Sequence, residues 1–207
     1  MKQIKIFSMM ISCFLIIGLL FTFAGCDMSP NKKISYAVTY TESGSGGEAV
    51  YGCDKYSGVT IDENTIKLCN SRQELLDFSD ENGFSFFEVK GEDFYHIKQR
   101  IYDSDLSQKI RSYDESFFND KSLVLIFVMF ENVYPAKIDT VAIEAEALAI
   151  KVAIPDEDSF LDAVSYHTFI IEVAKNSVQN KSAKLSVIRK GSAKDYLDEN
   201  EKYKWKV

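Results

Sequence analysis

Histidine is scarce in this chain: only His96 and His167 occur among 207 residues. A nucleophilic triad needs a base within hydrogen-bond reach of its nucleophile, and that base is most often histidine. The chain also lacks a Gly-x-Ser-x-Gly segment, which carries the nucleophile of α/β-hydrolases. His167 stands in a segment of strand composition, where a structural role is expected. We therefore predict no catalytic residue for this chain.

Patterns typical of metal and phosphate sites are also missing. Two isolated cysteines, Cys53 and Cys69, have no nearby pair of histidines to complete four zinc ligands. If Gly83 is aligned with the invariant glycine of an EF-hand loop, Phe78 and Val89 occupy positions that require acidic ligands. The glycines of 44–47 are not followed by the lysine and helix of a phosphate-binding loop. We predict no metal and no cofactor.

Basic residues are too few for a nucleic-acid-binding protein. The chain has 24 lysines and arginines against 31 aspartates and glutamates, a formal net charge of −7. Binding to nucleic acid requires basic residues that neutralise phosphates, so we expect no nucleic-acid partner. An anionic lipid surface should repel the acidic body as well.

The N-terminus has the three parts of a secretory signal. Lys2 and Lys5 precede an uncharged apolar stretch from Ile6 to Phe23, and the small pair Ala24-Gly25 precedes Cys26. This arrangement resembles the lipobox of bacterial lipoproteins, although that family prefers Leu at the position of Phe23.

The resemblance implies that residues 1–25 are a signal peptide and that Cys26 becomes a lipid-modified N-terminus. The protein would then be held on the outer face of the cytoplasmic membrane, and loss of two lysines and no acid would take its net charge from −7 to −9. The apolar stretch is also close to the ~20 residues that span a bilayer, so an uncleaved transmembrane anchor helix with a free Cys26 stays open as an alternative.

Cys53 and Cys69 are the cysteines left for the exported domain. Exported cysteine pairs can persist as disulfides, and closing this loop would contribute roughly 3 kcal/mol in the chain-entropy model. Two buried free thiols are the alternative.

The remaining pattern predicts an α+β fold. Residues 26–33 should form a lipid-anchored tether, and residues 34–207 a single extracytoplasmic domain. Ser71 and Glu74 match a capping box, so helices are expected at 72–81 and at 104–112, that is, one or two helices between about 71 and 112. Strands separated by turns indicate a mostly antiparallel sheet or sandwich. They are expected over 34–41, 49–51, 65–68, 122–130, 137–144, 148–154, 168–174, 184–190 and 203–207.

A second resemblance covers residues 105–190. The segments Tyr-Asp-Glu-Ser-Phe-Phe at 113–118, Lys-Ser-Leu-Val-Leu-Ile at 121–126 and the strand at 166–175 are similar to a pattern in small uncharacterised lipoproteins of Gram-positive bacteria. They also resemble the C-terminal β domain of the protease-complex protein PrcB. The resemblance implies an antiparallel β domain and supplies no catalytic residues.

Two functions follow as hypotheses. The first is a non-enzymatic binding or interaction module at the cell envelope, whose partner would be an envelope protein or a wall component. It predicts an exposed aromatic or apolar patch on the sheet. Tyrosines cluster at 36, 40, 51 and 56, and tyrosine is enriched in binding surfaces, but strand composition explains them as well and is the favoured interpretation. The alternative is an envelope hydrolase with paired carboxylates, which predicts two acids roughly 5–9 Å apart with perturbed pKa values.

Overall fold

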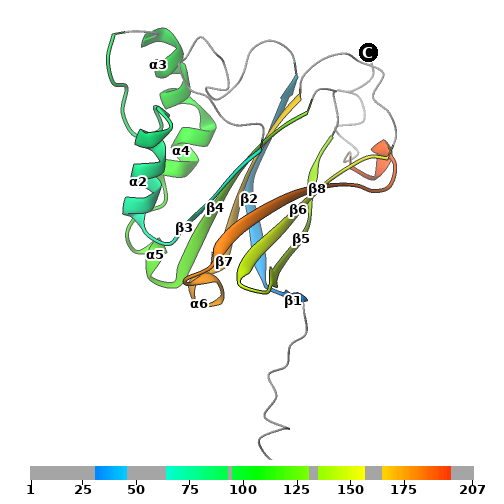
Figure 1. Cartoon of the computed structure of the whole chain (residues 1–207). Coiled ribbons are helices and arrows are strands. Elements are labelled where there is room, and N and C mark those ends of the chain that lie inside the picture. The colour runs from blue at the N-terminus through cyan, green and yellow to red at the C-terminus, as the bar shows by residue number, and fades with distance from the viewer. Residues whose placement is uncertain (1–30, 46–63, 93–94, 131–134, 157–164, 197–207) are drawn as a thin grey trace, which may run out of the picture. The chain divides into compact units, whose positions relative to one another are not determined.

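Two four-stranded sheets and a layer of short helices make up the domain (Figure 1). The structure is a computed structural model, and it describes residues 31–45, 64–92, 95–130, 135–156 and 165–196. The predicted α+β class with mostly antiparallel sheets is confirmed. The expected signal helix, Cys26, and the strands at 49–51 and 203–207 lie outside the described residues.

The first sheet, sheet B, has the strand order β2-β7-β4-β3, and all its pairs are antiparallel. Its strands are β2 (Tyr36–Ser45), β3 (Asn64–Cys69), β4 (Lys121–Phe130) and β7 (Ser165–Ala174). The continuous apolar run at 122–130 predicts a strand buried on both faces, and β4 is that strand: residues 122–128 are all buried. Both of its faces are apolar because one packs against the helices and the other against sheet A.

The second sheet, sheet A, has the order β1-β5-β6-β8. It contains β1 (Asn31–Lys33), β5 (Lys137–Glu144), β6 (Ala147–Ile154) and β8 (Ser182–Arg189). Glu144 pairs with Ala147, so Ala145 and Glu146 form the predicted two-residue turn, and Ala145 has a φ of 52°. Such turns require positive φ values.

One pair in sheet A departs from the antiparallel majority, and one expectation for this sheet is wrong. β8 pairs with β6 in parallel, because the chain leaves for β7 in the other sheet and returns before it forms β8. The alternation of Leu148, Ile150 and Val152 with Ala149, Lys151 and Ala153 predicts a strand with one buried face, but Ala149 and Ala153 are buried as well. β6 is a central strand, and Ala149 lies between Ala142 on β5 and Lys184 on β8.

The helical region is richer than expected. The helices at 72–81 and 104–112 are confirmed as α2 (Arg72–Glu81) and α4 (Asp105–Arg111). The structure adds α3 (Tyr95–Asp103), α5 (Phe117–Asp120), α6 (Lys175–Val178) and the 3₁₀ turn η1 (Ala193–Asp195). At α2, the Ser71 hydroxyl accepts from the Glu74 amide at 3.1 Å, as a capping box requires. The Glu74 carboxylate, however, accepts from the amide of Asn70, one residue before the cap.

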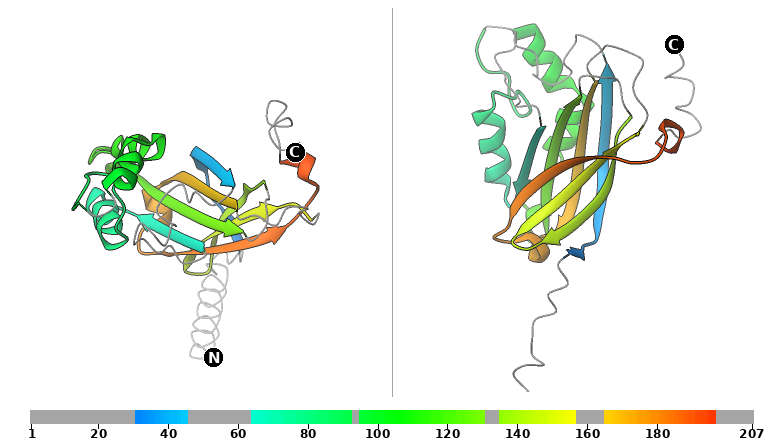
Figure 2. Two further views of the ribbon diagram at one scale, coloured as in Figure 1. Left: turned by 90° about the horizontal axis from the view of Figure 1, so that it is seen from above. Right: turned by 45° about the vertical axis from the view of Figure 1, so that its right-hand side comes forward.

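Two cores divide the domain into three layers (Figure 2). The helix-side core joins α2 and α4 to one face of sheet B, through Leu75, Leu106, Ile110, Leu125 and Ile170 among others. The inter-sheet core joins the other face of sheet B to sheet A, and includes Val124, Ile126, Ile150, Phe169 and Ile171. Odd and even residues of β4 therefore serve different cores, as alternation along a strand requires.

The N-terminal boundary needs a correction. Residues 31–33, placed in the tether by the sequence, form β1 and pair with β5. The compact unit accordingly begins at Asn31 rather than at residue 34. β2 also extends to Ser45 and takes in Gly44, which the sequence assigns to a loop. The backbone pairing with β7 outweighs the low strand preference of Gly and Ser.

Candidate binding surface

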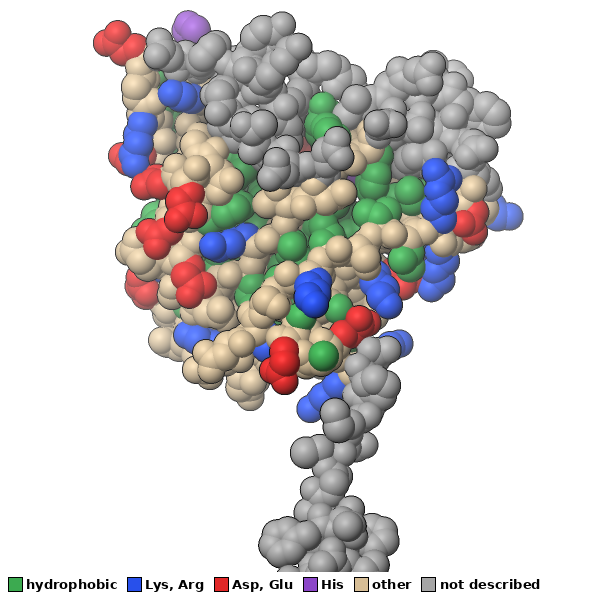
Figure 3. All heavy atoms as spheres, viewed as in Figure 1, with side chains coloured by type: hydrophobic (Ala, Val, Ile, Leu, Met, Phe, Trp, Pro, Cys, Tyr) green, Lys and Arg blue, Asp and Glu red, His purple; other side chains and the backbone are tan. Residues whose placement is uncertain are grey.

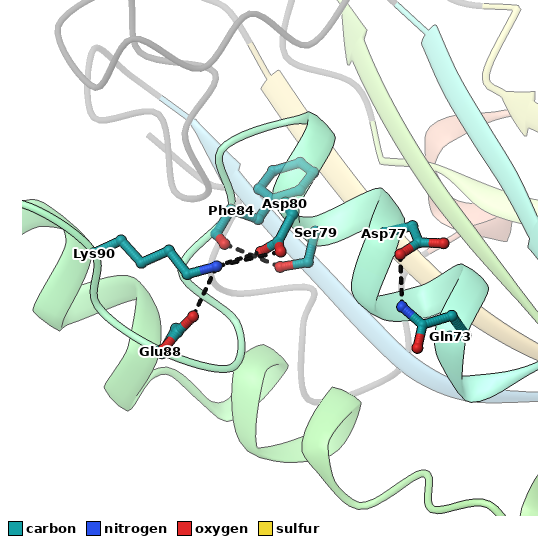
Figure 4. Close-up of polar contacts among 7 residues, drawn as sticks. All are labelled: Gln73, Asp77, Ser79, Asp80, Phe84, Glu88 and Lys90. Atoms are coloured by element: carbon teal, nitrogen blue, oxygen red, sulfur yellow. Dashed lines mark hydrogen bonds and ion pairs between the residues drawn. The ribbon is translucent and has the colours of Figure 1, made fainter.

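Asp80 in the last turn of α2 and Glu88 beyond the helix form an ion-pair cluster with Lys90 (Figure 4). Lys90 Nζ lies 3.0 Å from Asp80 Oδ1 and 2.7 Å from Glu88 Oε1. Hydrogen bonds to Glu88 and Asp80 raise the pKa of Lys90, so its ammonium form is favoured. Because this charge lies between the two carboxylates, the cluster does not have the form of a hydrolase pair or a calcium site.

Three other carboxyl groups have lowered pKa values, whereas a general acid needs a raised one. The pKa of Asp139 is lowered, chiefly by a hydrogen bond from Lys190, whose Nζ lies 2.7 Å from Oδ1. The pKa of Asp114 is lowered by the Ser116 hydroxyl, and that of Asp195 by the amide and hydroxyl of Ser192. A carboxyl group that acts as a general acid near neutral pH needs a raised pKa. These geometries do not support the paired-carboxylate hypothesis.

The two histidines lie in different layers. His96 is exposed on α3, next to Tyr95 at a ring-centroid distance of 6.1 Å. His167 is 2% exposed on β7 and its ring lies 5.7 Å from that of Phe130 and 6.3 Å from that of Phe169. The register places His167 opposite Val128, on the inter-sheet side. The structure therefore does not bring the histidines together.

Among the candidate cysteines, only Cys69 lies within the described residues. It is completely buried in the helix-side core as a free thiol, and burial raises its pKa to about 12. A thiol with such a pKa stays protonated and unreactive at neutral pH. Cys26 and Cys53 lie outside the described residues, so lipidation of Cys26 and the Cys53–Cys69 disulfide stay predictions.

The edge strand β2 is the surface that fits the expected apolar patch. Tyr36 and Val38 are 39% and 42% exposed, and they are two of the three large hydrophobic residues that are exposed among those described. They stand opposite Val173 and Ile171 and therefore point to the side of the inter-sheet core. That core takes no member from β2, so sheet A leaves these two side chains uncovered.

A β-bulge at Thr39 divides β2 into two segments whose side chains alternate out of phase with each other. Val38 pairs with Ile171 and Tyr40 with Ile170, so Thr39 is the extra residue. A bulge shifts the alternation of side chains by one residue. Tyr40 consequently points to the helix-side core, whereas Thr41 and Ser43 point to the same side as Val38.

Tyr113 fixes the bulge to the rest of the domain. Its hydroxyl lies 2.7 Å from Thr39 Oγ1 and donates to Glu172 Oε1 at 3.3 Å. Glu172 Oε2 in turn lies 2.6 Å from Lys121 Nζ. Burial raises the pKa of Tyr113, so its hydroxyl keeps its proton. β2 is thus held on its inner side by β7 and Tyr113, and its other edge has no described strand beside it.

Only part of this surface could be predicted from the sequence. The clustered tyrosines pointed to β2, but periodicity did not show that Tyr36 and Val38 would be uncovered. The charge pattern could have indicated the exposed edge, because β2 is a ten-residue strand with Glu42 as its sole charged residue.

No protein-family model matches the chain, and searches of curated proteins and of solved structures also found no match. Within the described ranges, no helix is long and apolar enough to cross a membrane, and no cluster of three or more potential metal ligands occurs.

Proposed function

We propose that the protein is a bacterial lipoprotein that acts as a non-enzymatic interaction module at the cell envelope. Residues 1–25 would be its signal peptide, and lipid on Cys26 would hold it to the outer face of the cytoplasmic membrane. Two or three acyl chains suffice for stable anchoring. The support for this anchor is the lipobox-like segment that ends at Cys26.

The observation that carries the binding role is the uncovered edge of β2. Its exposed Tyr36 and Val38 lie beside a row of backbone groups that face no described strand. Such edges accept extended segments by strand addition, with main-chain hydrogen bonds for affinity and alternate side chains for specificity. The domain can therefore act through one strand without a catalytic cleft.

Photo-crosslinking in intact cells tests this role. A benzoylphenylalanine at Val38 should give a specific crosslinked species that appears in the membrane fraction. The same group at Ser182, an exposed residue at the start of β8, is the matched control. Equal crosslinking from both positions, or none from Val38, would refute the β2 surface.

The anchor has its own test. The intact mass of the membrane-extracted protein should correspond to a chain that begins at a lipid-modified Cys26. An unprocessed chain that still begins at Met1 would overturn the lipoprotein assignment in favour of a transmembrane anchor.

A further inference from the structure

We infer that Asn82, at the C-terminal cap of α2, is a deamidation site that stays protected only while the cap is closed. Asn82-Gly83 is the one Asn-Gly pair in the chain. Glycine has no side chain, so its backbone nitrogen can approach a neighbouring side chain closely. An asparagine followed by glycine therefore loses its side-chain amide most readily. The inference concerns the helical layer and is independent of the role proposed for β2.

The reaction needs only water, and Gly83 is exposed to it. The backbone nitrogen of Gly83, after it loses its proton, attacks the side-chain carbon Cγ of Asn82. A new N–Cγ bond closes a succinimide ring, and the Cγ–Nδ2 bond breaks to release ammonia. Water then opens the ring at either carbonyl carbon and leaves aspartate or isoaspartate at position 82.

The closed cap keeps the two reacting groups apart. Asn82 Nδ2 donates to Phe78 O at 2.8 Å, so the side-chain amide points back along α2. The Gly83 N–H donates to Asp80 O at 3.2 Å, which opposes loss of its proton. Asn82 has a ψ of 5°, which turns the Gly83 nitrogen towards the backbone nitrogen of Asn82 and away from its side chain. These restraints must be released before the ring can close.

The buried Ser79 holds the cap closed. Its hydroxyl donates to Phe84 O at 2.9 Å, and the Phe84 amide donates to Ser79 O at 2.8 Å (Figure 4). Phe84 is itself buried, and its ring centroid lies 4.5 Å from that of Phe86 and 5.5 Å from that of Phe127. Opening of the turn at 79–84 has to break these contacts, so local opening should be rare in the folded protein.

Either product would weaken α2, because it adds a negative charge at the C-terminal end of the helix. Carboxylates are unfavourable there, and the last turn of α2 has no basic residue. Asp77, Asp80 and Glu81 already lie in the second half of this helix, and Figure 3 shows acidic side chains spread over the helical layer. The new carboxylate would also face Phe78 O, which loses its amide donor. A cap that has reacted would therefore stay weakened.

Peptide mass spectrometry of the full-length protein tests the site. Trypsin cuts after Arg72 and Lys90, and the peptide 73–90 contains Asn82 as its one asparagine. In mildly alkaline buffer, the acid form of this peptide should accumulate in urea-unfolded protein at least about tenfold faster than in folded protein. Equal rates would mean that the cap does not protect Asn82, and no reaction in the unfolded chain would refute the site. Either result overturns the inference.

A matched pair of serine substitutions tests the part played by the cap. Ser79→Ala removes the hydroxyl that donates to Phe84 O and should speed deamidation of the folded protein several-fold. Ser107→Ala removes another buried hydroxyl of the helical layer, which donates to Ile101 O, and should leave the rate at Asn82 unchanged. Equal acceleration by both variants would mean that the reaction follows general unfolding, and would overturn protection by the cap.

Asn82→Asp reproduces one of the products. Its urea midpoint should lie below that of Asn82→Ala, because both variants lose the amide donor but only aspartate adds the charge. If the two midpoints agree, or if Asn82→Asp is the more stable variant, the weakening attributed to the deamidated cap is wrong.

Discussion

β2 and β8 are the long edge strands of the two sheets, and they meet the solvent in different ways. β8 buries part of Leu185 against the inter-sheet core and exposes Lys184 and Arg189. β2 exposes Tyr36 and Val38 on the corresponding side and carries one charged residue. β8 is therefore a protected edge strand that contributes to the core. β2 pairs with β7 along one edge, and no described strand pairs with its other edge. The edge strands of one small domain can therefore differ in role, one contributing to stability and the other remaining open for interaction.

The largest effect should come from a matched pair of truncations. Leu185→Ala in β8 should lower the free energy of unfolding by about 2 kcal/mol, because it removes side-chain atoms from the inter-sheet core. Val38→Ala in β2 should change it by less than about 0.5 kcal/mol, as at an exposed site. Urea unfolding at low protein concentration measures both. Equal losses of unfolding free energy in the two variants would contradict the difference between the two edge strands.

A smaller effect on the free energy of unfolding is expected at the contact between Thr39 of β2 and Tyr113, which follows α4. Tyr113→Phe removes the hydroxyl that contacts Thr39 and Glu172, and should cost about 1 kcal/mol of unfolding free energy. Tyr102→Phe is the control, since the structure shows a contact of its ring with Arg111 but describes none of its hydroxyl. If both substitutions have the same effect, the Tyr113 hydroxyl does not hold β2.

The smallest effect concerns the residue that follows β8. Lys190 holds the pKa of Asp139 below its ordinary value, so the folded state binds this proton less readily than the unfolded chain does. The stabilisation is present above the unfolded pKa of about 4 and is lost as the pH falls through the lower folded value. Asp139→Asn should therefore reduce stability at pH 7, and the difference from the natural protein should shrink below about pH 4.

Thermal unfolding at a series of pH values measures this difference. Asp120→Asn serves as the control, because the structure describes no ion pair for Asp120. A constant difference between Asp139→Asn and the natural protein across the acid range would contradict the ion pair.

Much of the fold could be predicted because its signals are local. The apolar run of β4, the turn at Ala145 and the cap at Ser71 each depend on a few neighbouring residues. The parallel pairing of β8 with β6 could not be predicted, because it depends on which sheet the chain enters between them. α3 (Tyr-His-Ile-Lys-Gln-Arg-Ile-Tyr-Asp) was missed because no Ser/Thr-x-x-Glu capping box precedes it, whereas α2, which is no less polar, is marked by Ser71 and Glu74.

The candidate surface on β2 could also be predicted only in part, because its exposure depends on non-local structure. The sequence predicted an exposed aromatic or apolar patch, but strand composition alone does not distinguish Tyr36, which is exposed, from Tyr40 on the same strand, which packs against the helix-side core. Exposure of Val38 follows from the strand order, which ends at β2, and from the extent of sheet A. Both are properties of the assembled domain rather than of the segment.

Backbone amide hydrogen exchange of the full-length protein tests the open edge of β2 most directly. Amides of β2 should exchange faster than those of β4, which is paired on both sides, and faster than those of β8, whose Leu185 packs against the inter-sheet core. If β2 is as protected as β4 and β8, the contrast between the two edge strands is wrong.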